Sequence, residues 1–521
     1  MSRLEIPGYY FDEQKGKYFK IEKAHLAPSS AAWSSDNVKR KKVEDEAQRT
    51  AEKRKRLLRN HVRRHKALNR DDFTSGLLDW ETGVASATRG LSARVALASG
   101  ERTMRGQTWA RGLESKGDVP FAPSFARRRM PNMGCFWVDG GDEGTGLGVA
   151  YGCLDEETLV GSYIPTDENE RISFSVDSTH MRHPHTPGYR REVAICPQMS
   201  SIKYHAPSNK MILTSTQMAH QAGISIFSPT LSPEGTGQPR WLISNEVDHY
   251  RRTTEYRWTD QWTVHTSTPA PASLPGTLCV VGTNAGILHV SSNENISLLA
   301  STPTSYNRNN YAHYARKSTP HLPRAIFSLD FQLNNPHVLF AGGRQPRLWR
   351  TDLRTEGKEW SFEGVPSSIA HAKSLNEREV LAAGPKDFMA VYDVRNFGAM
   401  ETAAKIKGGS GGGDTMAKPV LTFPEHKNEA HIHTGLDVSH DLGLVATGQG
   451  DGTVKLFSTT SGRPLKPGGG KEGLSGVKTD TPIKALMFQK MPWERWESLW
   501  VGEGPALRKF SFGSKAWDDE V

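Results

Sequence analysis

The chain has 521 residues, of which 36% are hydrophobic, 49 are glycine and 30 are proline. Such a composition is typical of many short strands joined by loops. No apolar run approaches the ~18–20 residues that cross a bilayer, so no membrane partner is expected, and the first residues lack the form of a signal peptide. Four separated cysteines without a CxxC pair argue against disulfides or a zinc knuckle and favour a reducing intracellular compartment.

The net charge of +9 comes from one segment of the chain. Residues 38–70 hold 14 Lys or Arg against 4 Asp or Glu, a local charge of +10, whereas the remainder is close to neutral. A block of this kind is typical of an arm that meets an acidic partner.

The first 24 residues predict a short hairpin. Residues 6–21 read IPGYYFDEQKGKYFKI, in which aromatic and apolar residues flank a turn at Gly16. A lone two-stranded hairpin is marginal in water and needs another surface to pack on. Two interpretations stay open: a local staple for the N-terminus, or a peptide ligand for a partner.

Residues 25–130 are interpreted as a linker that contains one helix. The stretch from about 38 to 68 lacks Gly and Pro and is dominated by helix formers. Its apolar side is thin, so the helix is either exposed to solvent or ordered against a partner. Residues 71–130 are rich in Gly, Ser and Arg and are expected to be largely irregular.

Basic clusters on this helix allow several functions. They resemble nuclear import signals or a nucleic-acid arm, which favours the nucleus and leaves the cytoplasm open as a second location. A merely solvated helix is an equal alternative, and no aromatic interleaving supports stacking on bases. The candidate contacts to import machinery or an acidic partner are Lys39, Arg40, Lys41, Lys42, Lys53, Arg54, Lys55 and Arg56.

Residues 131–521 predict an all-β domain of seven similar units. Each unit has the order strand, turn, apolar strand, glycine-containing turn, strand, and the clearest is LGLVATGQGDGTVKLFS. One such sheet cannot bury both faces, but seven around an axis can, which predicts a seven-bladed WD40-type β-propeller. The segments expected to be long loops are Pro229–His265, Ser301–Leu322, Gly408–Asp414 and Gly462–Gly476.

No catalytic arrangement stands out along the chain. There is no GxSxG nucleophile motif and no GxxxxGK[ST] phosphate loop. His431 and His433 lie two residues apart, but no motif supplies the further ligands that a metal site needs. We therefore expect a protein that is not an enzyme and carries no cofactor and no metal.

Two Asp-x-Arg sequences, here called the boxes, recur at the spacing of propeller blades. Asp352 and Asp393 are 41 residues apart, as are Arg354 and Arg395, within the ~40–45 residues of a blade repeat. An Asp at the end of a third strand can accept backbone N–H groups of the turn. The Arg has no such duty, and its five donors suit carboxylates and carbonyls of a partner. Similar boxes also occur in propellers without a special partner.

The second box, AVYDVR, resembles the WDxR box of the WD-repeat substrate receptors of cullin-4 ubiquitin ligases, with Tyr392 in the Trp place. In the first box Thr351 precedes the Asp, and Trp349 lies two residues earlier. The N-terminal IPGYYFDEQKGKYFKI, the basic helix and the later units also resemble that family, the cullin-4-associated factors. Blade six ends KLFSTTSG and has no box.

The resemblance implies a non-catalytic receptor that docks on the large damaged-DNA-binding adaptor of the ligase and holds a protein substrate. It assigns adaptor binding to Asp352, Arg354, Tyr392, Asp393 and Arg395. It also leaves open that the basic helix is presented to the same adaptor. The alternative is a nuclear scaffold, associated with nucleic acid through its basic helix.

Overall fold

The computed structural model divides into two compact units, residues 1–71 and 72–521. None of the helices in the part of the chain that it describes has the length and apolar character needed to span a bilayer. The described residues are 8–12, 15–22, 33–60, 104–122, 131–142, 147–154, 158–167, 170–172, 191–195, 198–216, 223–229, 248–250, 263–301, 323, 325–354, 360–396, 416–470, 472–494 and 496–513.

The N-terminal unit consists of the expected hairpin and helix. Strands β1 (Tyr9–Asp12) and β2 (Lys17–Lys20) pair antiparallel, and α1 runs over Ser35–Asn60. The ring of Phe19 stacks on Trp33 with 4.7 Å between centroids, and Lys41 Nζ donates to the Tyr10 hydroxyl at 2.9 Å. The hairpin is therefore stapled to the start of the helix, and the ligand interpretation stays a prediction.

Helix α1 begins three residues before the predicted start at 38. Its side chains up to residue 52 are mostly exposed, and Val43 keeps 66% of its surface accessible. This matches the thin apolar side in the sequence. The predicted continuation over residues 61–68 lies outside the described residues.

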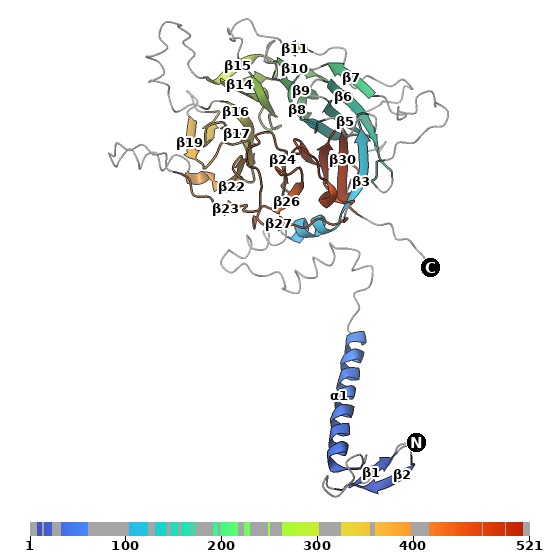
Figure 1. The fold of residues 1–521 in the computed structure, drawn as a ribbon. Coiled ribbons are helices and arrows are strands. Elements are labelled where there is room, and N and C mark those ends of the chain that lie inside the picture. The colour runs from blue at the N-terminus through green and yellow to red at the C-terminus, as the bar shows by residue number, and fades with distance from the viewer. Residues whose placement is uncertain are drawn as a thin grey trace, which may run out of the picture. The chain divides into compact units, whose positions relative to one another are not determined.

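The second unit is a seven-bladed β-propeller made of four-stranded antiparallel sheets, as predicted (Figure 1). Blades 1 to 3 contain β4 (Phe136–Asp142), β5 (Leu147–Leu154), β6 (Thr158–Pro165), β7 (Arg191–Ile195); β8 (Met199–His205), β9 (Lys210–Ser215), β10 (Gly223–Phe227), β11 (Asp248–Tyr250); and β12 (Val264–Pro269), β13 (Thr277–Thr283), β14 (Gly286–Ser291), β15 (Ile296–Ser301).

Blades 4 to 7 contain β16 (Ile326–Gln332), β17 (Asn335–Gly343), β18 (Arg347–Asp352), β19 (Trp360–Gly364); β20 (His371–Ser374), β21 (Glu379–Gly384), β22 (Phe388–Asp393), β23 (Leu421–Thr422); β24 (Leu436–Ser439), β25 (Leu444–Gly448), β26 (Val454–Ser458), β27 (Pro464–Leu465); and β28 (Leu486–Gln489), β29 (Ser498–Glu503), β30 (Ala506–Phe512), β3 (Leu113–Pro120). The architecture is consistent with a WD-repeat protein.

Seven hydrophobic clusters hold the ring together, one between each pair of adjacent blades. Successive strand residues point to opposite faces of a sheet, so a blade serves two clusters at once. In blade 4, Trp349 packs toward blade 3 whereas Leu348 packs toward blade 5. Neither face of a blade is left to water, which explains the apolar second strands in the sequence.

The last blade is closed by a strand from far upstream, which corrects the predicted domain start at residue 131. Strand β3 pairs with β30, and residues 104–111 before it are helical (Figure 1). A register shift between Ser115 and Asp118 gives β3 a burial period of three, with Leu113 and Val119 inside. The alternation that identifies strands is absent there, so the segment reads as irregular.

The predicted loops differ from one another in the structure. The segment Pro229–His265 contains the short strand β11 and runs into β12. The described residues of the segment Gly462–Gly476 pack on the propeller, because Leu474 is fully buried and the Gly468 amide donates to the Ala110 carbonyl at 2.8 Å. Residues 302–322 and 408–414 lie outside the described residues.

Candidate functional site

The two boxes occupy equivalent corners of neighbouring blades. Asp352 ends β18 and Asp393 ends β22, the third strands of blades 4 and 5. In the strand registers Asp352 lies opposite Val338 and Asp393 lies opposite Glu379, in each case the first residue of the second strand that pairs with the third. The 41-residue period of the sequence therefore corresponds to one blade.

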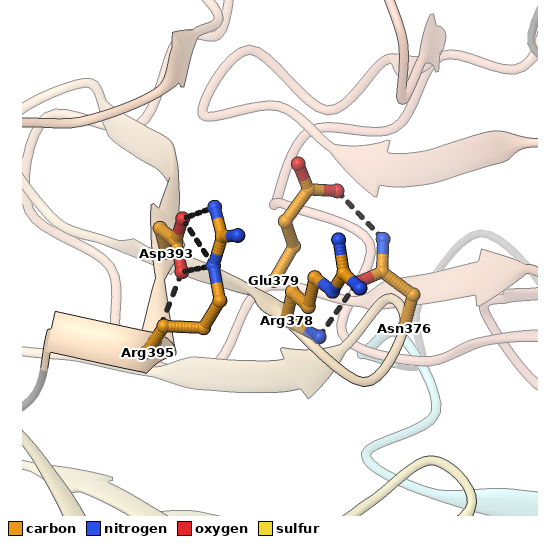
Figure 2. A network of polar contacts seen from close by, with 5 residues as sticks. All are labelled: Asn376, Arg378, Glu379, Asp393 and Arg395. Atoms are coloured by element: carbon orange, nitrogen blue, oxygen red, sulfur yellow. Dashed lines mark hydrogen bonds and ion pairs between the residues drawn. The ribbon is translucent and has the colours of Figure 1, made fainter. Parts of the chain in front are cut away.

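Each Asp binds the Arg of its own box. Asp352 Oδ1 accepts the Arg354 backbone N–H and its Nε, both at 3.0 Å, and Oδ2 accepts Nη2 at 2.7 Å. Asp393 binds Arg395 in the same way, with the backbone N–H at 2.9 Å and Nε at 3.0 Å (Figure 2). The predicted acceptance of a turn N–H by the Asp is confirmed.

The interpretation of the Arg residues needs a correction, because each guanidinium already binds within its box. The pair leaves 61% of the Arg354 and Arg395 side chains exposed. In the described part of the chain, no hydrogen bond is made by either Nη1 group. The carboxylate thus fixes the orientation of the guanidinium, while several guanidinium N–H donors stay accessible. This pre-ordered arrangement lowers the entropy lost on binding.

The box carboxylates keep a charge well into acid. The Arg354 side chain, by its hydrogen bonds, lowers the pKa of Asp352 to about 2, and Asp352 in turn raises the pKa of Arg354. Hydrogen bonds from Arg395 likewise lower the pKa of Asp393. Because the pKa of the Asp is depressed in the folded state, the stabilisation by the Asp–Arg ion pair is complete at pH values above the ordinary Asp pKa. It is lost as the pH falls through the pKa of the folded state.

We predict that Asp352 titrates near pH 2 in the intact chain and returns toward its ordinary value of 3.8 in Arg354→Ala. Carbon-13 chemical shifts of selectively labelled Asp carboxyls measure this. Arg344→Ala, at an exposed turn of the same blade, is the control and leaves the midpoint unchanged. An Asp352 midpoint that does not respond to loss of Arg354 contradicts the paired geometry.

Blade 6 shows what the same corner looks like without a box. Ser458 stands opposite Leu444 at the start of the second strand, as the box Asp residues do, and its Oγ accepts the Thr460 N–H at 3.3 Å. A serine thus satisfies the turn, and Thr460 takes the place of the Arg. The turn requires a side-chain acceptor but no guanidinium.

The aromatic position of the box is part of the core. Tyr392 is 2% exposed in the cluster between blades 4 and 5, and burial raises the pKa of its hydroxyl to about 12. Its hydroxyl has no hydrogen-bond partner among the described residues. Thr351 occupies the equivalent position in blade 4, and the ring of Trp349, two residues earlier on the same face of β18, packs in the core there. Tyr392 supports the box from inside and does not reach the surface.

Two further arginines, Arg350 and Arg378, lie beside the boxes. They are not part of an Asp-x-Arg sequence, so the spacing of the boxes does not identify them. Arg350 Nη1 donates to the Val394 carbonyl at 3.3 Å, which ties blade 4 to the box of blade 5. Arg378 is exposed in the turn before β21, near the box of blade 5 (Figure 2). Its carbonyl accepts the Val394 amide at 2.8 Å. The hairpin register of β21 and β22 is the signal that links Arg378 to the box. We call Arg354, Arg378 and Arg395 the arginine corner.

The first basic cluster of the helix is exposed, and two of its side chains make contacts within the N-terminal unit. Lys39, Arg40, Lys41 and Lys42 lie in the exposed part of α1. Arg40 Nε lies 3.7 Å from Glu44 Oε1, and Lys41 lies over the Tyr10 ring at 5.2 Å. The side chains of the second cluster, residues 53–56, lie outside the described residues.

Comparison with models of known protein families gave no match, and comparison with curated proteins gave none either. Among the described residues, no group of three or more His, Cys, Asp or Glu is arranged to hold a metal ion. The fold itself is compatible with a WD-repeat adaptor or scaffold and is typical of non-catalytic interaction proteins.

Proposed function

We propose that this chain is a substrate receptor of a cullin-4-type ubiquitin ligase and docks on the damaged-DNA-binding adaptor through the arginine corner. The supporting observation is the pair of matched boxes on neighbouring blades, each presenting an exposed guanidinium already held by its own carboxylate. Arginine is enriched at the points that dominate interface energies. The resemblance of AVYDVR to the WDxR box supplies the identity of the partner.

The mechanism is positional. One rim binds the adaptor, a substrate is held elsewhere on the propeller, and other subunits transfer ubiquitin. Holding two reactants side by side turns a bimolecular step into a local one, which is the whole contribution required of a receptor. The inter-blade bond from Arg350 to the Val394 carbonyl keeps the two boxes at a fixed spacing, as a rigid docking surface requires.

We predict that Arg354→Ala with Arg395→Ala abolishes co-purification with the adaptor. Loss of a hot-spot Arg costs about 2 kcal/mol or more, or roughly thirty-fold in affinity for each position. The variants keep their fold because blade 6 forms the same turn without an Arg. The readout is capture of the adaptor by tagged full-length chain, normalised to the amount of chain.

Arg344→Ala is the matched control, since it removes one exposed Arg from the β17–β18 turn at the opposite end of blade 4. Equal capture by the double variant, or loss of capture in Arg344→Ala alone, would mean that the boxes do not dock.

A nuclear scaffold that meets nucleic acid is the second candidate, favoured by the +10 segment at residues 38–70. Phosphate contacts would give an affinity that falls steeply with salt. Nucleic-acid binding by the intact chain without adaptor, lost when residues 38–70 are deleted, supports this candidate.

A further inference from the structure

The hairpin of the N-terminal unit has two faces, and one of them packs against the start of the helix. Residues directly opposite each other in an antiparallel pair point to the same face, and successive residues alternate between faces. Tyr10 lies opposite Phe19 in the register. The Tyr10 hydroxyl accepts a hydrogen bond from Lys41 at 2.9 Å, and the Phe19 ring stacks on Trp33. This face therefore anchors the hairpin.

The other face of the hairpin carries three aromatic rings. Phe11 lies opposite Tyr18, and their ring centroids are 4.8 Å apart. Tyr9 lies two residues before Phe11 and shares this face. Tyr9 and Tyr18 keep 47% and 40% of their surface exposed. Apolar side chains that gather on one exposed face mark interaction sites, whereas single scattered ones do not. We call Tyr9, Phe11 and Tyr18 the aromatic face.

The surroundings of the aromatic face are cationic. Lys20 lies opposite Tyr9 in the register and is exposed on the same face. The first basic cluster, Lys39–Lys42, occupies the second turn of α1, and its bond to the hairpin holds the cluster close to the rings. Together with the +10 charge of residues 38–70, these lysines favour an acidic partner.

A single strand of nucleic acid fits both features. An acidic protein would pair with the lysines, but it offers few flat surfaces to exposed rings. A single strand presents a phosphate at every step and unstacked bases that can stack on aromatic side chains. A duplex keeps its bases stacked inside, so it could use only the lysines.

We propose that the aromatic face and the adjoining basic cluster bind a single strand of nucleic acid. Bases stack on Tyr9 and Tyr18, and phosphates contact Lys20 and the lysines of α1. Diagonal neighbours across two paired strands are about 7–8 Å apart, so each tyrosine ring takes a base of its own. Every base has a π-face, so the binding is independent of sequence.

The arrangement depends on the fold of the N-terminal unit. Residues 38–70 contain no aromatic side chain, so the basic segment alone offers nothing on which a base could stack. The anchored hairpin brings the rings to the first turns of α1 (Figure 1). This inference does not rest on adaptor docking through the arginine corner, and it adds selectivity for single strands to the second candidate function.

Fluorescence anisotropy with the full-length chain and labelled probes tests the proposal. The probes are an oligothymidylate, an oligouridylate and a duplex of the same length. We expect one or both single strands to bind more tightly than the duplex, with affinities that fall as salt is raised. A duplex bound as tightly as the strands would overturn the proposal.

Loss of the two exposed rings should act on the single strand alone. Tyr9→Leu with Tyr18→Leu should weaken strand binding by at least about tenfold and leave duplex binding unchanged. Tyr9→Phe with Tyr18→Phe should retain strand binding, because the stacking surface is kept. Val43→Ala, at an exposed apolar side chain of α1, is the control and should bind like wild type.

Lysine variants separate the charge from the rings. Lys39→Gln with Lys42→Gln should weaken the strand and the duplex alike and reduce the dependence of affinity on salt. An affinity for the strand that these two substitutions leave unchanged would contradict the contact between the phosphates and the basic cluster.

Photocross-linking gives a readout that does not depend on the stability of a hairpin variant. A strand that carries iodouracil, irradiated on the wild-type chain, should cross-link to Tyr9 or Tyr18, as mapped by mass spectrometry. Cross-links confined to other segments, or equal strand binding by the leucine variant, would overturn the proposal.

Failure of this inference can be told apart from failure of the second candidate function. Strand binding that the leucine variant retains, but that deletion of residues 38–70 removes, would overturn the aromatic face alone. No binding of any probe by the wild-type chain would overturn both.

Discussion

Replacing Lys509 by methionine is expected to lower the free energy of unfolding by about 3–5 kcal/mol, because removal of one partner strands a buried charge. Lys509 is 1% exposed and forms an ion pair with Glu494, which is fully buried. The ammonium also donates to the Glu170 carbonyl at 2.8 Å, and Glu494 Oε2 accepts the Ser498 hydroxyl at 2.8 Å. The pair thus ties blade 7 to the segment that follows β6 of blade 1, where the ring closes.

Urea unfolding followed by near-ultraviolet circular dichroism measures this difference. The neighbouring Arg508→Met is the control: Arg508 pairs with Glu503 at 2.9 Å in a partly exposed position, so its loss should cost no more than about 1 kcal/mol. Adding Glu494→Gln to Lys509→Met should recover part of the stability, since the stranded charge is removed. Equal effects of the two single variants would show that the buried pair is not a stability determinant.

Gly452→Ala is expected to destabilise the propeller by about 2–4 kcal/mol, through backbone strain and overpacking together. Gly452 has φ of +79°, and a Cβ there would lie 1.8 Å from the Thr479 carbonyl oxygen. The residue sits in the GQGDG turn between β25 and β26, where the Thr479 amide donates to the Gly452 carbonyl at 3.2 Å.

The same turn supplies the control for Gly452. A Cβ on Gly450 would meet no atom closer than 3.6 Å, and the residue lies outside the left-handed region. Gly450→Ala should therefore change the unfolding midpoint little. Similar midpoints for the two variants in the same thermal or urea experiment would contradict the geometry of this turn.

The propeller could be predicted because each blade repeats a pattern that its burial requires. Strands such as β25 and β21 are packed on both faces, so their sequences are continuous apolar runs between turn residues. Strand β3 could not be found in this way, because its register shift removes the alternation and its partner β30 lies nearly 400 residues away. Closure by a distant strand leaves no local signal.

The candidate site was only partly predictable, for a similar reason. The spacing of the boxes placed Arg354 and Arg395 on adjacent blades, but it did not show that each Arg binds the Asp two residues before it. The link between the boxes was invisible as well, since Arg350 of blade 4 reaches the Val394 carbonyl of blade 5 only in the closed ring. The spacing of a repeat predicts which residues occupy equivalent positions in different blades. It does not predict which side chains of different blades are in contact.

The most direct test of the docking proposal is the affinity of the purified chain for purified adaptor, with the single and double box variants measured in one titration series. We predict tight binding by wild type, a loss of roughly thirty-fold for each of Arg354→Ala and Arg395→Ala, and no detectable binding by the double variant. Wild-type affinity in the double variant would contradict the central claim.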